Sequence, residues 1–395
     1  MNTIDEIDLV DIAIDAFKYG EKAFCKFISA NDAGKTGGHQ AGFYIPKDAF
    51  QLAFDAPGLK GGNKEKFVKI LWQHSFNTES RFVYYGKKTR NEYRLTRFGK
   101  GFPFFADEYV GALLVIIQNS NTNYRAFVFS KEESIETIYS SLNLSVTDNN
   151  VLVPLKGKAG YEDKLNECFL SYIDGLQVDF PPTLDLAQKA RECYRQVHRI
   201  SDAQVRGDSD KYILGWLKSE YRLFKTIENQ RYEHLVKKPL GSVDILVKVS
   251  NSILNRRKSR AGKSLEHHLA AMFKINSLRF EAQAVTEGKK NPDFLFPNAE
   301  AYHNPNFNKS KLVFLASKTT CKDRWRQILN EADKLQTKYL FTLQQGISRY
   351  QLREMYSSGV RLVVPRAYLK SYPKEYHNDL STLGSFISKV KALQS

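Results

Sequence analysis

The last third of the chain alternates short apolar runs with amphipathic segments, and this alternation constrains the fold more than any other feature of the sequence. Strands are predicted at clusters of β-branched and aromatic residues, near 280–286, 293–296, 312–318, 339–343 and 361–364. Helices are predicted from apolar residues at helical spacing, over about 211–236, 241–255, 264–273 (with Ser264 as N-cap) and 323–336. Because helices and strands alternate, we expect residues 211–395 to form an α/β domain, a mixed sheet flanked by helices.

The first part of the chain, residues 1–172, has the pattern of a mainly β domain. Its strand-like segments are rich in aromatic and β-branched residues and are separated by Gly, Asn and Asp; examples are 42–45, 81–85 and 111–117. Short strands with turn residues between them predict a barrel or sandwich. The double proline at 181–182 and the polar stretch 201–210 then predict a hinge over residues 173–210.

The charge of the chain indicates which kind of partner it binds, and its cysteine content indicates the redox environment in which it acts. Lys and Arg outnumber Asp and Glu by 59 to 43, a net charge of +16 that favours nucleic acid or another anionic partner, although a merely basic protein would share it. The four cysteines (Cys25, Cys168, Cys193 and Cys321) form no CxxC pair, so we expect reduced thiols and neither a zinc site nor a disulfide framework. The acidic N-terminus and the lack of a long apolar run predict a cytoplasmic protein that does not enter a membrane.

Carboxylates and one lysine in the last third are the parts of a magnesium-dependent phosphodiesterase. Asp293 begins one short apolar strand and Lys318 ends another, so adjacent strands would bring both to one end of a sheet. Glu331 lies at the edge of the buried face of the predicted helix 323–336, and Glu266 lies on an earlier helix. Carboxylates bind Mg²⁺ through oxygen, and a lysine can steady the attacking water and the phosphate charge. We therefore expect Asp293 and Glu331 to bind Mg²⁺, with Lys318 and Glu266 completing the catalytic set.

Each of these residues also has an ordinary structural interpretation. Asp293 would cap a turn, and Glu331 would pair with Lys334 along a solvated helix face. For any one residue alone the structural interpretation is favoured, whereas the ordered set within one α/β domain favours the catalytic one. The pair His267-His268 has no HExxH motif around it and is expected to pack rather than to bind metal.

Three segments, 257–266, 286–297 and 318–333, closely resemble the EcoRII family of restriction endonucleases. The resemblance implies a PD-(D/E)xK nuclease fold and Mg²⁺-dependent cleavage of double-stranded DNA. In the common form of that motif a carboxylate stands two residues before the lysine, where this chain has Ala316. The EcoRII-like variant moves the second acid to the following helix, which corresponds to Glu331 here.

Two stretches of the last third are predicted to contact DNA. The run 255–263 contains five cations and no acid, and would contact phosphates unless it is only a solubilising loop; its cations are Arg256, Arg257, Lys258, Arg260 and Lys263. The family resemblance assigns the reading of CC·GG base pairs to Lys322, Asp323 and Arg324. Arg can donate to guanine O6 and N7, and Asp can accept from cytosine N4, although Asp323 would also suit a helix cap.

Segments 29–32, 36–46 and 88–99 resemble the effector domain of the same family, which implies a B3-like pseudobarrel that binds a second copy of the recognition sequence. Between Lys87 and Lys100 there are six cations and one acid, interleaved with aromatic residues, a pattern that fits DNA binding or a solvated basic hairpin. The predicted DNA-binding residues of this domain are His39, Tyr44, Lys88, Arg90, Glu92 and Arg94.

The resemblance predicts a type IIE restriction endonuclease that cuts at a CCWGG-like site (W is A or T) and leaves 5′-phosphate ends. It implies a homodimer, a companion DNA methyltransferase and an effector domain that masks the catalytic cleft until DNA binds. Three alternatives remain: a non-cleaving sequence-specific DNA-binding protein, a structure- or lesion-directed nuclease, and an enzyme of the same fold that recognises CCNGG or a longer site.

Overall fold

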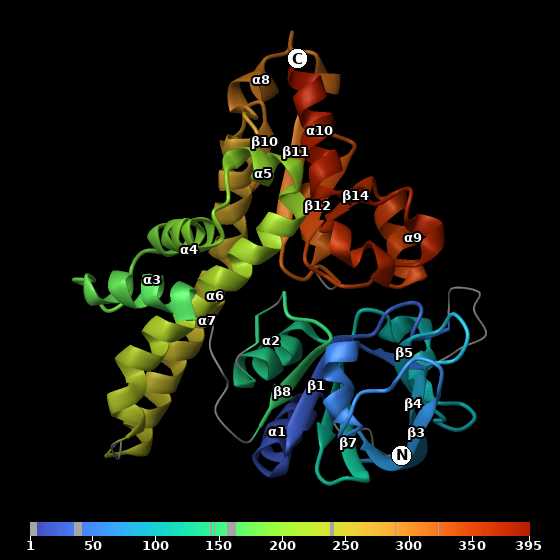
Figure 1. Ribbon diagram of the computed structural model, residues 1–395. Coiled ribbons are helices and arrows are strands. Elements are labelled where there is room, and N and C mark those ends of the chain that lie inside the picture. Colours follow the sequence, from blue (N-terminus) through green and yellow to red (C-terminus); the bar gives the residue numbers. More distant parts are fainter. Residues whose placement is uncertain are drawn as a thin grey trace. The chain divides into compact units, whose positions relative to one another are not determined.

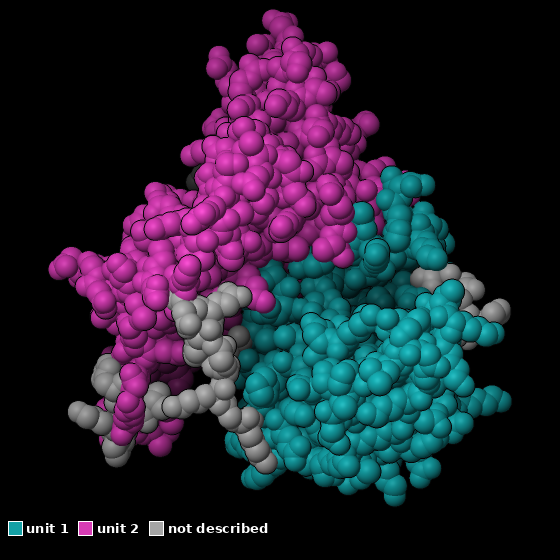
Figure 2. Space-filling view, viewed as in Figure 1, with its two compact units in different colours: residues 1–159, 344–354, 368–378 teal, residues 160–343, 355–367, 379–395 magenta. Residues whose placement is uncertain are grey.

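The computed structural model describes residues 6–34, 42–142, 144–145, 147–155, 163–237, 241–288, 290–322 and 324–395. The chain forms two compact units, which Figure 2 distinguishes by colour. Unit 1 contains residues 1–159, 344–354 and 368–378, and unit 2 contains residues 160–343, 355–367 and 379–395. The C-terminal part of the sequence therefore contributes two short segments to unit 1, an arrangement that local sequence patterns do not reveal.

Unit 1 is built on one eight-stranded, mostly antiparallel sheet with the strand order β2-β5-β4-β3-β7-β6-β1-β8 (Figure 1). The strands are β1 (Lys22–Phe27), β2 (Phe43–Ile45), β3 (Lys64–Trp72), β4 (Phe76–Tyr85), β5 (Glu92–Thr96), β6 (Leu113–Gln118), β7 (Asn123–Phe129) and β8 (Val151–Pro154). Two helices, α1 (Glu6–Tyr19) and α2 (Glu132–Ser141), pack against each other. The mainly β fold predicted for this part of the chain is confirmed.

Both faces of the unit 1 sheet are buried. In β1, Phe24 joins a cluster rich in aromatic rings that includes Trp72 and Phe102, whereas Ala23 and Phe27 point to a second cluster with α1 and α2. This alternation follows from the two-residue period of a strand. One face of the sheet therefore packs on the aromatic cluster, and the other face packs on α1 and α2.

Unit 2 contains a six-stranded mixed sheet with the order β14-β13-β12-β11-β10-β9. The strands are β9 (Glu281–Ala282), β10 (Phe294–Phe296), β11 (Val313–Lys318), β12 (Lys338–Thr342), β13 (Val360–Val364) and β14 (Ser381–Thr382). From β11 to β14 the neighbours are parallel, and from β9 to β11 they are antiparallel. Strands β11 and β12 are almost wholly buried, as expected for parallel strands covered on both faces. The predicted α/β fold is confirmed.

The helices of the C-terminal two-thirds are α3 (Asp163–Asp174), α4 (Thr183–His198), α5 (Asp202–Gly207), α6 (Ser209–Val236), α7 (Val243–Ile275), α8 (Ala299–His303), α9 (Arg349–Ser357) and α10 (Leu383–Gln394). The long helices α6 and α7 pack side by side, as Figure 1 shows. Among the described residues, none of the helices combines the length and apolarity needed to cross a membrane.

Residues 173–210, where a hinge is predicted, are largely helical. They contain α4 and α5, and Leu186, Ala190 and Cys193 of α4 are buried in a cluster with α3 and α6. The division between the units falls at 159/160 instead of near 172. Proline at position 182 precedes the first residue of α4, where it starts a helix and does not interrupt one.

The expectation of two separate helices over 241–255 and 264–273 is also corrected, because both belong to the single 33-residue helix α7. Ser264 is therefore not an N-cap. It lies buried inside the helix, and its hydroxyl donates to Glu220 Oε2 on α6 at 2.8 Å. The polar run that suggested a loop is helical because its arginines find acidic partners on α6.

The cysteine prediction is wrong for one pair. Cys168 on α3 and Cys193 on α4 form a disulfide, with their Cα atoms 5.8 Å apart. The packing of two helices brings together residues 25 positions apart, which no short spacing motif reports. Cys25 and Cys321 are buried and take no part in the disulfide.

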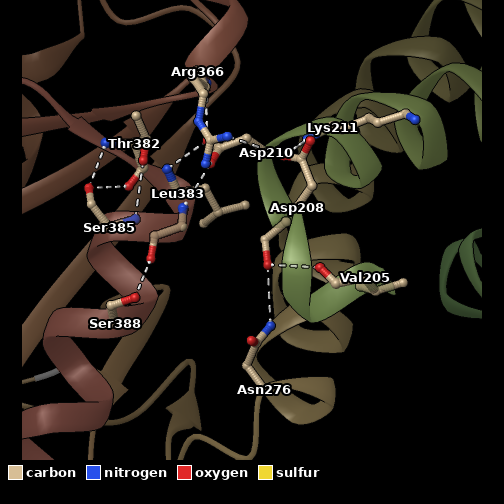
Figure 3. Close-up of polar contacts among 12 residues, drawn as sticks. Val205, Asp208, Asp210, Lys211, Asn276, Arg366, Thr382, Leu383, Ser385 and Ser388 are labelled. Atoms are coloured by element: carbon tan, nitrogen blue, oxygen red, sulfur yellow. Dashed lines mark hydrogen bonds and ion pairs between the residues drawn. The ribbon is translucent and has the colours of Figure 1, made fainter. Parts of the chain in front are cut away.

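A buried carboxylate joins the helices of unit 2 to its sheet (Figure 3). Asp210, in the first turn of α6, accepts backbone hydrogen bonds from Arg366 at 3.0 Å, Leu383 at 2.8 Å and Gly384 at 3.0 Å. These last two donors are the free N–H groups at the start of α10, which favour a negative charge. Asp210 therefore fixes α10 and the end of β13 against α6.

Candidate active site

Asp293 is held at the start of β10 by its neighbours in the sheet. Its Oδ2 accepts from the Ser317 backbone N–H at 2.7 Å and from the Ser317 hydroxyl at 3.1 Å. Strands β10 and β11 pair with Phe294 opposite Leu315, so this register places Asp293 beside Ser317 and close to Lys318 at the end of β11. The predicted meeting of the two strand ends is what the structure shows.

Glu266 on α7 reaches the same place through a glutamine that the sequence reasoning missed. The Gln283 side-chain amide donates to Glu266 Oε2 at 3.1 Å and to Asp293 Oδ1 at 3.3 Å. Burial and the nearby Asp293 raise the pKa of Glu266, and Lys318 opposes this shift. Gln283 has a left-handed backbone (φ 54°), and its N–H donates to the Asp293 carbonyl at 3.1 Å. No local motif marks it, because its role depends on this turn.

Glu331 completes the cluster. Burial raises the pKa of its carboxyl to about 6; Asp293 adds to the shift, and Lys318 and Lys338 oppose it. Asp293 and Lys318 thus act electrostatically on both Glu266 and Glu331. The structure gathers all four predicted catalytic residues at one end of the unit 2 sheet.

The helix predicted over 323–336 is not formed, and Glu331 approaches the site from a turn. A short 3₁₀ helix covers Trp325–Asn330, Glu331 follows it in an extended conformation, and Ala332 is left-handed with φ 52°. The alternative role for Glu331, an ion pair with Lys334, is absent from the described contacts, in which the Lys334 ammonium donates to the Tyr302 carbonyl at 3.0 Å. Three side chains outside the segment, those of Glu287, Tyr302 and Lys338, bind its backbone in this shape.

The basic run of α7 divides into structural and exposed cations. Arg257 makes a two-pronged ion pair with Glu228, at 2.8 and 2.7 Å, and Arg260 donates to Glu220 at 3.2 Å. Arg256 stacks over the Phe180 ring, 3.8 Å from its centroid. In contrast, the side chains of Lys258 and Lys263 are exposed.

The predicted base-reading triplet lies directly after the catalytic strand. Lys322 is half-buried and Arg324 is exposed, in the turn between β11 and the 3₁₀ helix. The Arg324 N–H donates to the Cys321 carbonyl at 3.2 Å, which fixes the backbone of this turn. Asp323 lies outside the described residues.

In unit 1 the predicted effector-binding residues cluster on β2 and β5. Tyr44 pairs with Arg94 across the two strands, and Arg94 donates to Glu92 Oε1 at 3.2 Å. Arg94 is buried and also donates to the Gly42 carbonyl, so it supports the surface that Tyr44 and Glu92 present. Lys88 and Arg90 are exposed on the neighbouring loop, and His39 lies outside the described residues.

A buried ion pair beneath this surface escaped the sequence reasoning. Lys26 and Asp32 lie 2.7 Å apart, with side chains only 3% and 1% exposed. The Tyr44 N–H donates to Asp32 Oδ1 at 2.8 Å, and Lys26 donates to the Tyr44 carbonyl at 3.1 Å. This pair anchors Tyr44 from both sides of its backbone.

Comparisons with known proteins find matches for both parts of the chain. One matching family model is described as EcoRII C terminal and covers residues 224–387; another, restriction endonuclease EcoRII, N-terminal, covers residues 18–147. The type II restriction enzyme EcoRII of Escherichia coli is 37% identical over 390 residues, which is 94% of each protein. Metal-depleted Ecl18kI in complex with uncleaved DNA has a TM-score of 0.46 at 18% identity, over 58% of this chain and 84% of that one. The PspGI–substrate DNA complex has a TM-score of 0.44 at 16% identity, over 54% and 93%.

The α/β unit with its carboxylate–lysine cluster, joined in one chain to a mainly β B3-like unit, defines a type II restriction endonuclease of the PD-(D/E)xK superfamily, a site-specific DNA nuclease. The 37% identity to EcoRII extends along nearly the whole of both proteins and therefore also shows the family. The chain belongs to the EcoRII family of type II restriction enzymes, as its resemblance predicted.

A restriction endonuclease uses a divalent metal in general, and the donor set at the end of the sheet fits one. Asp293, Glu266 and Glu331 offer carboxylate oxygens, which hard divalent cations prefer. Burial and the negative charge of Asp293 raise the pKa of both glutamates, so a cation would relieve an existing repulsion. In the part of the chain that the structure describes, no three His, Cys, Asp or Glu side chains already surround a common metal position. Water and phosphate oxygens would therefore complete the coordination.

Proposed function

We propose that this enzyme makes Mg²⁺-dependent double-strand cuts in DNA at a CCWGG-like sequence and leaves 5′-phosphate ends. The observation that carries the proposal is the gathering of Asp293, Lys318, Glu331 and Glu266 at one end of the unit 2 sheet. Asp293 and Glu331 would hold the metal, which when bound supplies Lewis acidity for activating water and neutralising the phosphate.

The protein groups have separate tasks in this reaction. The Lys318 ammonium orients the attacking water and offsets charge that develops on the phosphate. Ser317 donates two hydrogen bonds to Asp293 Oδ2 and so orients its carboxylate. Gln283 couples Asp293 to Glu266, which keeps the second glutamate beside the metal position without adding charge.

The residues proposed to read DNA bases in the catalytic domain lie just after β11, near the catalytic cluster. We assign the reading of guanine and cytosine edges to Lys322, Asp323 and Arg324, directly after the catalytic strand. Lys258 and Lys263 would contact phosphates, and Arg256, Arg257 and Arg260 would support them by fixing α7 to its neighbours.

In the N-terminal domain, His39, Tyr44, Lys88, Arg90, Glu92 and Arg94 would bind a second copy of the sequence, and this binding would stimulate cleavage, as in a type IIE enzyme. The exposed Lys88 and Arg90 suit phosphate contacts, and Tyr44 and Glu92 suit base contacts. A two-fold sequence requires two active sites for a double-strand cut, so the active form would be a homodimer. The enzyme would act in the cytoplasm, beside a DNA methyltransferase that protects the host sites.

The test is cleavage of a plasmid with several CCWGG sites, with and without Mg²⁺, beside a site-free plasmid and a Lys318→Ala variant. We expect sequence-mapped fragments from the wild type alone, only with metal, and faster cutting when short CCWGG duplexes are added. A site-specific gel shift without any cutting would overturn the enzyme assignment in favour of a DNA-binding protein. Cutting of the site-free plasmid would overturn the sequence assignment, and cutting at CCNGG would redefine the central base pair.

A further inference from the structure

The turn that carries Glu331 is held from one side by a buried lysine. Lys338 begins β12 and is only 6% exposed. Its ammonium donates to the carbonyl of Glu331 and, at 3.0 Å, to the carbonyl of Ala332. Both acceptors are thereby satisfied away from water, where an unpaired carbonyl is costly.

The other side of the same turn is held by a glutamate and a tyrosine. Glu287 Oε2 accepts the Asp333 N–H at 3.1 Å, and the Tyr302 hydroxyl oxygen accepts the Lys334 N–H at 3.1 Å. The Tyr302 hydroxyl in turn donates to Glu287 Oε1, and the Tyr302 side chain is buried. Lysine at 338 and the Glu287–Tyr302 pair therefore bind successive backbone groups of residues 331–334.

These contacts explain why the segment is not helical. Ala332 adopts a left-handed conformation with φ 52°, which is disfavoured for any residue with a Cβ. The carbonyls of Glu331 and Ala332 accept hydrogen bonds from the Lys338 ammonium and do not accept the backbone hydrogen bonds of an α-helix. The position of the second acid is thus set by side chains that lie outside its own segment.

We infer that Lys338 and the Glu287–Tyr302 pair are positioning residues for Glu331, which they hold at the metal position through its backbone. None of the three touches Asp293 or Lys318 in the described contacts. Besides holding the backbone, the Lys338 ammonium acts on the Glu331 carboxyl through its positive charge, which Lys338→Arg keeps. The inference rests on the proposed role of Glu331 as a metal ligand. In this variant of the motif, in which the second acid follows the lysine strand, the inference assigns residues that hold that acid in place.

The test compares full-length Lys338→Met with Lys338→Arg, and with Lys389→Met as a matched control. Lys389 contacts Tyr339 of the same strand β12, and the contacts of the described residues include none between Lys389 and the turn of Glu331. Single-turnover cleavage of a CCWGG duplex is measured over a range of Mg²⁺ concentrations. DNA binding without Mg²⁺ and thermal unfolding are measured on the same samples.

For Lys338→Met we expect cleavage to fall by about tenfold or more and to need more Mg²⁺ for half its maximal rate, with metal-free DNA binding unchanged. Lys338→Arg should recover part of the rate, because a guanidinium can donate to the same carbonyls. Tyr302→Phe removes one hydroxyl and keeps the ring, so it tests the other side of the turn even if Lys338→Met fails to fold. It should shift the Mg²⁺ dependence in the same direction.

The inference is overturned if Lys338→Met and Tyr302→Phe both keep the Mg²⁺ dependence of Lys389→Met, or if binding and cleavage fall together. Glu331→Gln separates this outcome from failure of the proposed function. If Glu331→Gln still cleaves at the wild-type rate, the metal-ligand role of Glu331 is itself wrong. If Glu331→Gln is inactive while Lys338→Met behaves as wild type, only the positioning role is wrong.

Discussion

Glu266 and Asp293, which lie on a helix and at the start of a strand, share one hydrogen-bond donor, the side-chain amide of Gln283. An amide nitrogen carries two hydrogens and no charge, so it can serve two carboxylates without neutralising either. Burial and the negative charge of Asp293 still raise the pKa of Glu266. Gln283 therefore orients the carboxylates of Glu266 and Asp293 but does not neutralise their negative charge, which a bound cation would do.

Replacing this donor by an acid should make the stability of the enzyme depend more strongly on metal. In Gln283→Glu a third carboxylate faces Glu266 and Asp293, so we expect a lower melting temperature without metal and a larger rise on adding Mg²⁺ than in the wild type. Thermal unfolding with and without Mg²⁺ measures both. Gln283→Ala, which removes the donor and adds no charge, is the control; equal Mg²⁺ responses in the two variants would contradict the prediction.

Neighbouring cations of α7 should behave differently when each is truncated. Arg257→Ala removes the two-pronged partner of the nearly buried Glu228, which keeps Lys225, and should lower the free energy of unfolding by about 2 kcal/mol. Lys258→Ala should leave stability unchanged and reduce the slope of log binding constant against log salt concentration by about 1. Chemical denaturation and DNA binding at several salt concentrations measure the two effects. Equal effects of both variants on stability would show that Arg257 is not a structural cation.

His268 connects the helices of unit 2 in an uncharged state. It is fully buried, with Nε2 2.9 Å from Glu220 Oε2 and the Arg191 guanidinium 3.1 Å from Nδ1. Because the guanidinium can only donate, Nδ1 accepts and Nε2 carries the hydrogen. Burial lowers the pKa of His268, and the hydrogen bond to Glu220 opposes that shift. The packing role expected for this histidine agrees with the contacts.

This lowered pKa should make the protein less stable in mild acid. Below pH 6.5 the unfolded chain binds a proton at His268 that the folded protein resists, so stability present at higher pH is lost as the pH falls. One such proton changes the free energy of unfolding by at most about 1.4 kcal/mol per pH unit. Denaturation of the wild type and of His268→Gln at several pH values tests this: the variant should show the flatter dependence. Parallel curves would assign the loss to other groups.

The Cys168–Cys193 bond should make stability sensitive to reductant. Closing a loop of 25 residues restricts the unfolded chain, and breaking the bond should lower the free energy of unfolding by about 3 kcal/mol. Denaturation with and without dithiothreitol measures the change. The double variant Cys168→Ala, Cys193→Ala should lose the response, whereas Cys25 and Cys321 remain reduced thiols in both proteins. A reductant response that persists in the double variant would exclude this pair as its source.

Several strands of both units were predictable because they depend on a local pattern, whereas the short β14 (Ser381–Thr382) was not predicted. Strands β6 and β11 are apolar except at their last residues, and short buried apolar runs of this kind favour strands of a sheet covered on both faces. The approach of Asp293 to Lys318 followed from the same patterns, because it needs only the ends of two adjacent strands. Glu331 and Glu266 were found through the family resemblance and the helical spacing around them.

The remaining features depend on contacts between distant segments. The segment after Trp325 has the apolar spacing of a helix, but Lys338 and the Glu287–Tyr302 pair bind its backbone in another shape. The arginines of α7 were expected to face DNA because their acidic partners lie on a different helix. Gln283 carries no motif at all. In each case the deciding partner is far away in the sequence.

Helix α7 has a consequence for attempts to re-engineer this enzyme. It is unbroken from Val243 to Ile275 and carries both Arg257 and Glu266, which at 1.5 Å per residue lie roughly 14 Å apart along its axis. No loop separates them to absorb a change in length or register. A one-residue insertion between them would rotate Glu266 by about 100° away from Gln283. If the first half of this helix is replaced by a segment from another protein, the replacement must therefore have the same number of residues, so that Glu266 keeps its orientation.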